Sequence, residues 1–168
     1  MIDAWADHFQ FMARYNRWAN RRLYDSCEAL PKWEYLKLRQ AFFSSIHGTL
    51  SHLLVGDLVW FARFLGEAAT VSALDEQPHA TLAELRMARD SQDEKIITYI
   101  DGLSHAEILG TISYARLGGE RYEDELRPLL THVFNHQTHH RGQVHGMLSG
   151  TSVEPPLLDI IYYMREAQ

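Results

Sequence analysis

Four long segments of the chain carry apolar residues at helical spacing, and this pattern limits the fold more than any other feature. The segments that we expect to be helical are residues 3–28, 44–65, 81–100 and 128–149. Pro31 follows the first segment and Gly66 ends the second. Thr81 and Glu84 give the third segment a capping-box start. These signals predict an all-α fold built as an antiparallel four-helix bundle.

The shorter segments add a hairpin and a last helix to this plan. Residues 107–125 alternate weakly around Gly118-Gly119, which predicts a short hairpin with a plain turn. After Pro155-Pro156 the apolar residues up to Arg165 predict a short C-terminal helix. No shift in composition divides the chain, and 168 residues suffice for one core. We therefore expect a single domain over residues 1–168.

Charge and cysteine content exclude several classes of protein. The net charge of −6 argues against a nucleic-acid-binding surface, which needs clustered cations. Four arginines at helical spacing predict a solvated basic face: Arg14, Arg17, Arg21 and Arg22. A single cysteine, Cys27, allows no intramolecular disulfide and suits a reducing compartment. No apolar run reaches the roughly 18 residues of a membrane span, so we expect a cytoplasmic protein without a membrane partner.

The segment from Thr131 to Gln143 is rich in histidine and indicates a metal site. His136 and His140 lie one helical turn apart on one face, so that both imidazoles can bind one ion. His132 and His136 have the same spacing and remain an alternative pair. His132 and His140 are about 12 Å apart along a helix axis, so one ion cannot take all three. His139 points to one side of this face.

A third ligand has to come from another helix, and the second helical segment offers two histidines. His52 lies close to the core-facing apolar stripe, whereas His47 lies near the start of the segment and looks peripheral. Asp57 could orient an imidazole, or could equally be solvated or capping. The alternative without a metal is that His52 is a hydrogen-bonded core residue and the His136 group only packs.

Missing carboxylates exclude two familiar kinds of metalloenzyme. A di-iron bundle needs Glu-x-x-His pairs, and the only one here, from Glu76 to His79, straddles Pro78 in a linker. A zinc peptidase of the His-Glu-x-x-His type uses its glutamate as general base. In this chain Gln137 stands at that position, which disfavours peptidase chemistry.

Three stretches resemble signatures of the DinB/YfiT-like family of metal-dependent enzymes: residues 15–20, residues 45–60 and residues 132–143. The resemblance extends over essentially the whole chain and implies a four-helix bundle and a homodimer. It also implies a divalent ion held by His52, His136 and His140. Nickel or zinc is the ion usually assigned in the family, and iron or manganese is compatible with such a site.

Three imidazole ligands leave a position open on the ion, as catalytic sites do. We expect a metal-dependent enzyme acting on an unidentified small molecule, either a hydrolase or a thiol-dependent transferase or isomerase that uses a low-molecular-weight thiol. Candidate general bases are His132, His139 and Asp57, and the sequence does not select a catalytic residue among them. The alternatives are a non-catalytic metal-binding or stress-response protein, and a helical interaction module in which the histidines pack.

Overall fold

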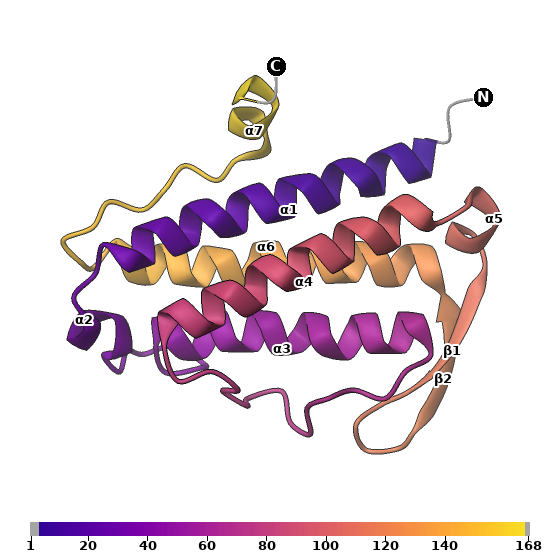
Figure 1. Cartoon of the computed structure of the whole chain (residues 1–168), viewed down its shortest axis with the longest axis horizontal. Helices are drawn as coiled ribbons and strands as arrows, with labels where there is room; N and C mark the ends of the chain where they lie inside the picture. The colour runs from indigo at the N-terminus through magenta and orange to yellow at the C-terminus, as the bar shows by residue number, and fades with distance from the viewer. Residues whose placement is uncertain (1–3, 167–168) are drawn as a thin grey trace.

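The computed structural model describes residues 4–166, which form seven helices and one two-stranded sheet (Figure 1). The elements are α1 (Ala4–Glu28), α2 (Lys32–Leu36), α3 (Ile46–Leu65), α4 (Leu82–Gly102), α5 (His105–Ile108), β1 (Thr111–Ala115), β2 (Arg121–Glu125), α6 (Leu126–Leu148) and α7 (Ile160–Glu166). No helix in this part of the chain is both long enough and apolar enough to cross a membrane.

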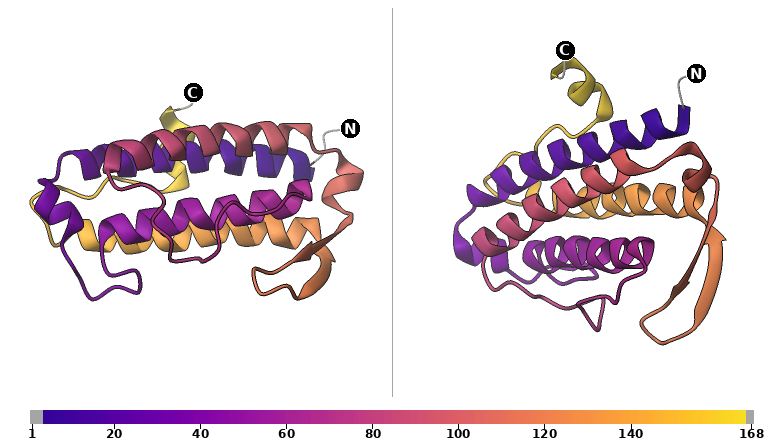
Figure 2. Two further views of the ribbon diagram at one scale, coloured as in Figure 1. Left: turned by 60° about the horizontal axis from the view of Figure 1, so that its bottom comes forward. Right: turned by 45° about the vertical axis from the view of Figure 1, so that its right-hand side comes forward.

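The four long helices lie side by side, with α1 packed on α4 and α6, and α3 packed on the same two helices. Figures 1 and 2 show that α1 and α6 run in one direction while α3 and α4 run in the other. Because α3 and α4 point the same way, the chain has to return along the molecule between them. Residues 67–80 make this return and contain no helix or strand.

The ends of the long helices follow from local chemistry. The side chain of Ser45 accepts a hydrogen bond from the Gly48 amide and caps α3, so this helix starts two residues later than the predicted Ser44. Gly66 ends α3 in the left-handed conformation, with φ of 69°. The capping box of Thr81 and Glu84 is present at the start of α4. The predicted start of the first helix at Asp3 lies outside the described residues.

Several short elements differ from the expectation. The hairpin is confirmed, with Thr111 opposite Glu125 and Ala115 opposite Arg121, and so is the short helix α7 near the C-terminus. Helices α2 and α5 were not predicted. The α5 helix nevertheless has its own capping box, formed by Ser104 and the Glu107 that was assigned to the hairpin segment. A helix of four residues is too short for a periodic pattern to reveal it.

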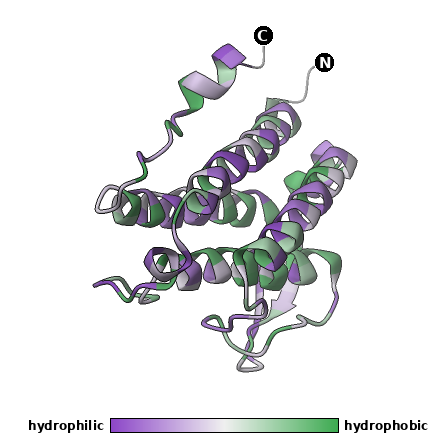
Figure 3. Ribbon diagram, turned by 60° about the vertical axis from the view of Figure 1, so that its left-hand side comes forward, coloured by the Kyte–Doolittle hydropathy of each residue, from purple (hydrophilic) through white to green (hydrophobic). Residues whose placement is uncertain are grey.

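Apolar side chains form two large clusters at opposite ends of the long helices. One contains Phe9, Phe61, Ile96 and Leu130, and lies toward the hairpin. The other contains Leu23, Leu50, Leu85 and Val144. The ribbons of the long helices alternate between hydrophobic and hydrophilic colours in Figure 3, as helices with one buried face do.

Between the two apolar clusters lies a layer of buried polar side chains, to which all four long helices contribute. Its members are Asn16, Asn20, Asp57, Arg89, Asp93, Gln137 and Arg141, all at most 4% exposed. We call this set the polar layer. In each helix its residues fall between those of the two clusters in the sequence.

Arg89 stands at the centre of the polar layer and pairs with two carboxylates. Its Nη1 lies 2.7 Å from Asp57 Oδ2, and its Nη2 lies 2.9 Å from Asp93 Oδ1. Asp57 also accepts a hydrogen bond from Gln137 Nε2 at 2.7 Å. Burial raises the pKa of both aspartates, and the charge of Arg89 opposes that rise. Asp57 is therefore neither solvated nor the partner of an imidazole.

The second half of the polar layer joins α1 to both α4 and α6. Asn20 Nδ2 donates to both carboxylate oxygens of Asp93 at 3.1 Å. Arg141 donates to the side-chain oxygens of Asn16 and Asn20. The layer holds two arginines and two aspartates, so its formal charges cancel.

The sequence predicted a solvated basic face on α1. This face does lie at the surface, but its arginines form ion pairs there. Arg14 pairs with Asp101 and Arg17 with Glu94, each at 2.8 Å. Arg22 pairs with Glu166 of α7 at 2.9 Å. Exposed pairs of this kind contribute little free energy each, but they line up α1 with α4 and α7.

We predict that Arg89→Met lowers the free energy of unfolding by about 3–5 kcal/mol, because it leaves two buried carboxylates without their cation. The measurement is urea denaturation of the metal-free protein. Arg21→Met is the control, since this arginine of α1 makes only exposed ion pairs, with Asp90 and Glu94 of α4; its loss should change stability by at most about 1 kcal/mol. Similar losses in both variants would contradict a structural role for the polar layer.

Candidate metal centre

Three histidines converge where α3 faces α6. His52 comes from α3, and His136 and His140 come from successive turns of α6. Each offers one ring nitrogen, and these nitrogens lie within 4.8 Å of one another. His52 Nε2 and His136 Nε2 are 3.0 Å apart. Nitrogen ligands at tetrahedral positions around an ion with bonds of 2.0–2.1 Å are about 3.3 Å apart, so small movements of the rings would bring all three nitrogens to one ion.

Hydrogen bonds orient two of the three imidazoles. His52 Nδ1 lies 2.8 Å from the backbone oxygen of Leu74, and His140 Nδ1 lies 2.8 Å from Gln143 Oε1. Both oxygens can only accept, so each Nδ1 carries the proton and each Nε2 keeps its lone pair for an ion. Fixing the tautomer through the far nitrogen is the usual device in histidine metal sites.

The third imidazole, His136, has its place because residue 56 is a glycine. A Cβ atom added at Gly56 would lie 3.1 Å from His136 Cε1, closer than side chains normally pack. The absence of a side chain at Gly56 thus lets the ring of His136 lie against α3. The sequence contains Gly56, but nothing in its pattern indicates this contact.

Phe43 covers one side of the three histidines and was not foreseen. Its ring stacks on His52 with centroids 3.8 Å apart and meets the ring of His140 edge-on at 5.6 Å. Phe43 lies in the turn before α3, and the turn is tight because the next residue, Ser44, has a φ of 64°. A Cβ at Gly48 would collide with the Phe43 backbone oxygen, so Gly48 lets the turn approach α3.

The electrostatics of the group favour neutral imidazoles. Burial lowers the pKa of His52 and of His140. Burial and the neighbouring imidazoles, His140 first, lower the pKa of His136 to about 3. Neutral imidazole is the form that binds a metal. At neutral pH all three rings therefore have a lone pair available.

The remaining histidine candidates lie elsewhere. His132 is outside the group of three, and its ring packs against Trp60 with centroids 5.2 Å apart. His139 is exposed and accepts a hydrogen bond from Gln143 Nε2 at 3.2 Å. The alternative pair of His132 and His136 does not converge with His52.

His47 was expected to be peripheral because it lies near the start of α3, but the structure buries it. It is 3% exposed, and its Nε2 donates to the backbone oxygen of His79 at 3.0 Å. Its Nδ1 therefore accepts the hydrogen bond from the Tyr35 hydroxyl at 2.7 Å. His47 thus ties the end of the return segment 67–80 to the start of α3.

A cavity of about 840 Å³ opens beside His52 and His136. Its other walls are Trp60 and Arg63 of α3, the hairpin, and His132 of α6. Phe43 is not among its lining residues. The histidine group is thus covered by an aromatic ring on one side and adjoins a cavity large enough for a small molecule on another.

Comparison with known proteins identifies the family of the chain. The family described as the DinB family matches residues 6–168. Protein DinB of Bacillus subtilis (strain 168) is 32% identical over 140 residues, which are 80% of each of the two chains. The chain belongs to the DinB family.

Proposed function

We propose that this protein is a metal-dependent enzyme that binds one divalent ion through His52, His136 and His140 and acts on a small molecule. The observation that carries the proposal is the convergence of three neutral imidazoles, two of them with their free nitrogen set by hydrogen bonds, beside a cavity. Packed histidines would also have their N–H groups hydrogen-bonded, but packing alone does not require one nitrogen of each of the three rings to converge within 4.8 Å.

The donor set suits zinc or nickel, and iron or manganese would also accept imidazole nitrogen. Three protein ligands leave at least one position open to water or substrate. Once bound, the ion would supply Lewis-acid activation of a water molecule or a thiol. The reaction is then either hydrolysis or transfer to a low-molecular-weight thiol.

The residues around the centre divide the remaining tasks. Phe43 excludes water from one side of His52 and His140. Among the three candidate bases only His132 lines the cavity, whereas Asp57 is committed to the polar layer and His139 faces away. We therefore place His132 as the group that would accept a proton from a nucleophile in the cavity.

The assembly around the centre is part of the same proposal. The long helices fit the antiparallel four-helix bundle that the family resemblance implies, with α1 against α4 and α3 against α6 as the antiparallel pairs. We propose that residues 1–168 form one domain and that two chains form a cytoplasmic homodimer. Trp33, 66% exposed, is an apolar side chain that a partner could cover.

Elemental analysis of protein purified without a nickel column tests the metal site. We expect about one divalent ion per chain in the wild type and almost none in His136→Ala, because two imidazoles alone bind weakly. His139→Ala is the matched control, since it removes an exposed histidine of the same helix outside the group. Full metal content in His136→Ala would refute the assignment.

The role of Gly56 can be tested through metal affinity. Gly56→Ala should weaken zinc binding by about tenfold or more, because the new methyl group pushes His136 out of place. Gly146→Ala on α6 is the control, since a Cβ there meets no atom within 4 Å. Both changes favour helix formation to a similar degree, so only the clash at His136 distinguishes them. Equal zinc affinity in the two variants would contradict the role of Gly56.

The lowered pKa of His136 also predicts how pH affects the metal-free protein. The unfolded chain takes up this proton below about pH 6.5, its ordinary pKa, whereas the folded chain takes it up only near about 3. The free energy of unfolding therefore falls as the pH drops below about 6.5, and His136 accounts for about 1.4 kcal/mol of the fall at about pH 5.5. Urea denaturation at about pH 7.5 and at about pH 5.5 gives the fall in the free energy of unfolding, which should be smaller in His136→Gln. An unchanged slope in that variant would contradict the prediction.

A further inference from the structure

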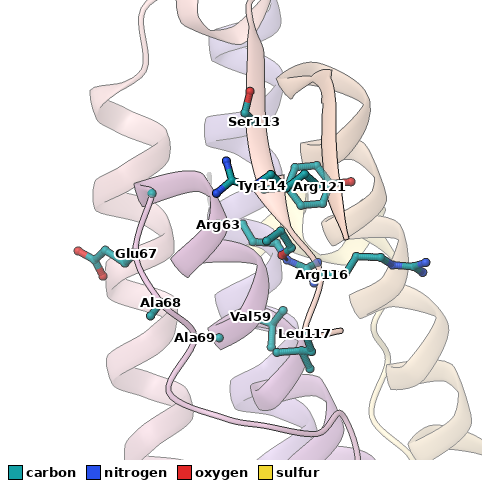
Figure 4. A pocket seen from close by; sticks show the side chains of 12 residues that line it. Val59, Arg63, Glu67, Ala68, Ala69, Ser113, Tyr114, Arg116, Leu117 and Arg121 are labelled. Carbon is teal, nitrogen blue, oxygen red and sulfur yellow. Dashed lines mark hydrogen bonds between the residues drawn. The ribbon is translucent and has the colours of Figure 1, made fainter. Parts of the chain in front are cut away.

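The cavity beside the histidines extends along α3 to a cluster of cationic and aromatic side chains. Arg63 and Tyr114 line this cavity together with His52 and His136. They also line a second cavity of about 490 Å³, which lies between the end of α3, residues 66–69 and the hairpin. Figure 4 shows the second cavity, with Arg63, Tyr114 and Arg116 gathered where α3 meets the hairpin.

Aromatic rings and one backbone oxygen hold the guanidinium of Arg63 in place. Its Cζ lies 4.6 Å from the centre of the Trp60 ring and 5.3 Å from that of Tyr114. Its Nε donates to the backbone oxygen of Ala115 at 3.2 Å. These contacts occupy Nε and the flat face of the guanidinium. The two terminal nitrogens, which form a fork that fits a carboxylate, remain for another partner.

The positive charge of Arg63 is not matched by an acidic side chain. Within residues 4–166 no carboxylate lies at ion-pair distance from it. The two acidic residues of the cavity have other partners. Asp124 accepts a hydrogen bond from the Tyr114 hydroxyl at 2.9 Å, and Glu120 lies 3.6 Å from Arg116 Nη1. Burial and the charge of Arg116 lower the pKa of Arg63, as expected for a half-buried cation that lacks an anion.

From these contacts we infer that Arg63 is the binding site for a carboxylate group of the substrate, with the body of the substrate lying on Trp60 and Tyr114. This inference rests on the proposed function, because it takes the reacting end of the substrate to lie at the histidines. A half-buried arginine stacked on aromatic rings, with its fork open to a cavity, is the arrangement that proteins use for carboxylates.

The same geometry sets the length of the substrate. Gly56 faces His136, and Arg63 follows seven residues later on α3. Seven residues of helix span about 10 Å. A ligand with about five methylene units between the reacting group and the carboxylate has this length, and the aromatic wall favours an apolar chain between them.

Two thiols that differ only in the far group test this inference: mercaptohexanoate and mercaptohexanol. The sulfur suits zinc or nickel, and only the first compound offers a carboxylate to Arg63. Calorimetric titration of the zinc-loaded protein gives both dissociation constants. We expect the wild type to bind the carboxylate at least tenfold more tightly than the alcohol. In Arg63→Gln the ratio should fall to within about twofold, and Arg63→Lys should retain part of it.

Arg127→Gln is the matched control. Arg127 also stacks on an indole ring, with its Cζ 4.9 Å from the centre of Trp5, but it does not line the cavity. It should keep the wild-type ratio. Equal binding of the two thiols by the wild type, or an unchanged ratio in Arg63→Gln, would overturn the inference.

Failure of the metal site would give a different result from failure of the Arg63 site. If the wild type bound no zinc, the proposed function would be wrong, and the metal-free protein would then be titrated with mercaptohexanoate alone. Binding that is lost in Arg63→Gln but kept in Arg127→Gln would preserve the carboxylate site. Absence of binding by the metal-free wild type would refute the carboxylate site as well.

Discussion

The pairing of Arg89 with Asp57 and Asp93 is the interaction on which the arrangement of the helices depends. A buried charge without a partner costs several kcal/mol, so the three side chains are compatible with a folded state only together. Asp57 belongs to α3, while Arg89 and Asp93 belong to α4. The apolar clusters on either side could tolerate small sliding movements of the helices, but the pairing fixes their relative position.

The same layer orients the candidate metal centre. Each of the two α6 histidines of the centre is followed by a residue anchored in the polar layer: His136 by Gln137, and His140 by Arg141. Successive residues point about 100° apart around a helix. The anchored side chains therefore turn α6 so that both histidines face His52 instead of the core. The hydrogen bonds of Gln137 and Arg141 select one rotation of α6 about its axis. Apolar packing alone selects such a rotation less sharply, so the polar layer is what orients the two histidines.

The sequence predicted the long helices well because capping and stop signals are local. Thr81 and Gly66 mark helix ends by chemistry confined to a few residues. The sequence also places His52, His136 and His140 where the structure brings them together, although their role as ligands stays a prediction. The polar layer could not be predicted, because Asp57 and Arg89 look like ordinary charged residues until the helices are assembled. His47 was misjudged for the same reason, since its partners Tyr35 and His79 come from other segments.

The structure separates what holds the histidines from what shapes the cavity. The ligand helices are fixed by the polar layer, whereas the walls near Arg63 come from the last turns of α3 and from the hairpin. The hairpin pairs only two strands, and every residue of β2 is exposed. Substitutions at the exposed Arg116 or Tyr122 therefore cost little stability and alter the cavity without moving the histidines. A centre built in this way can keep its three imidazoles while the hairpin changes which small molecule reaches them.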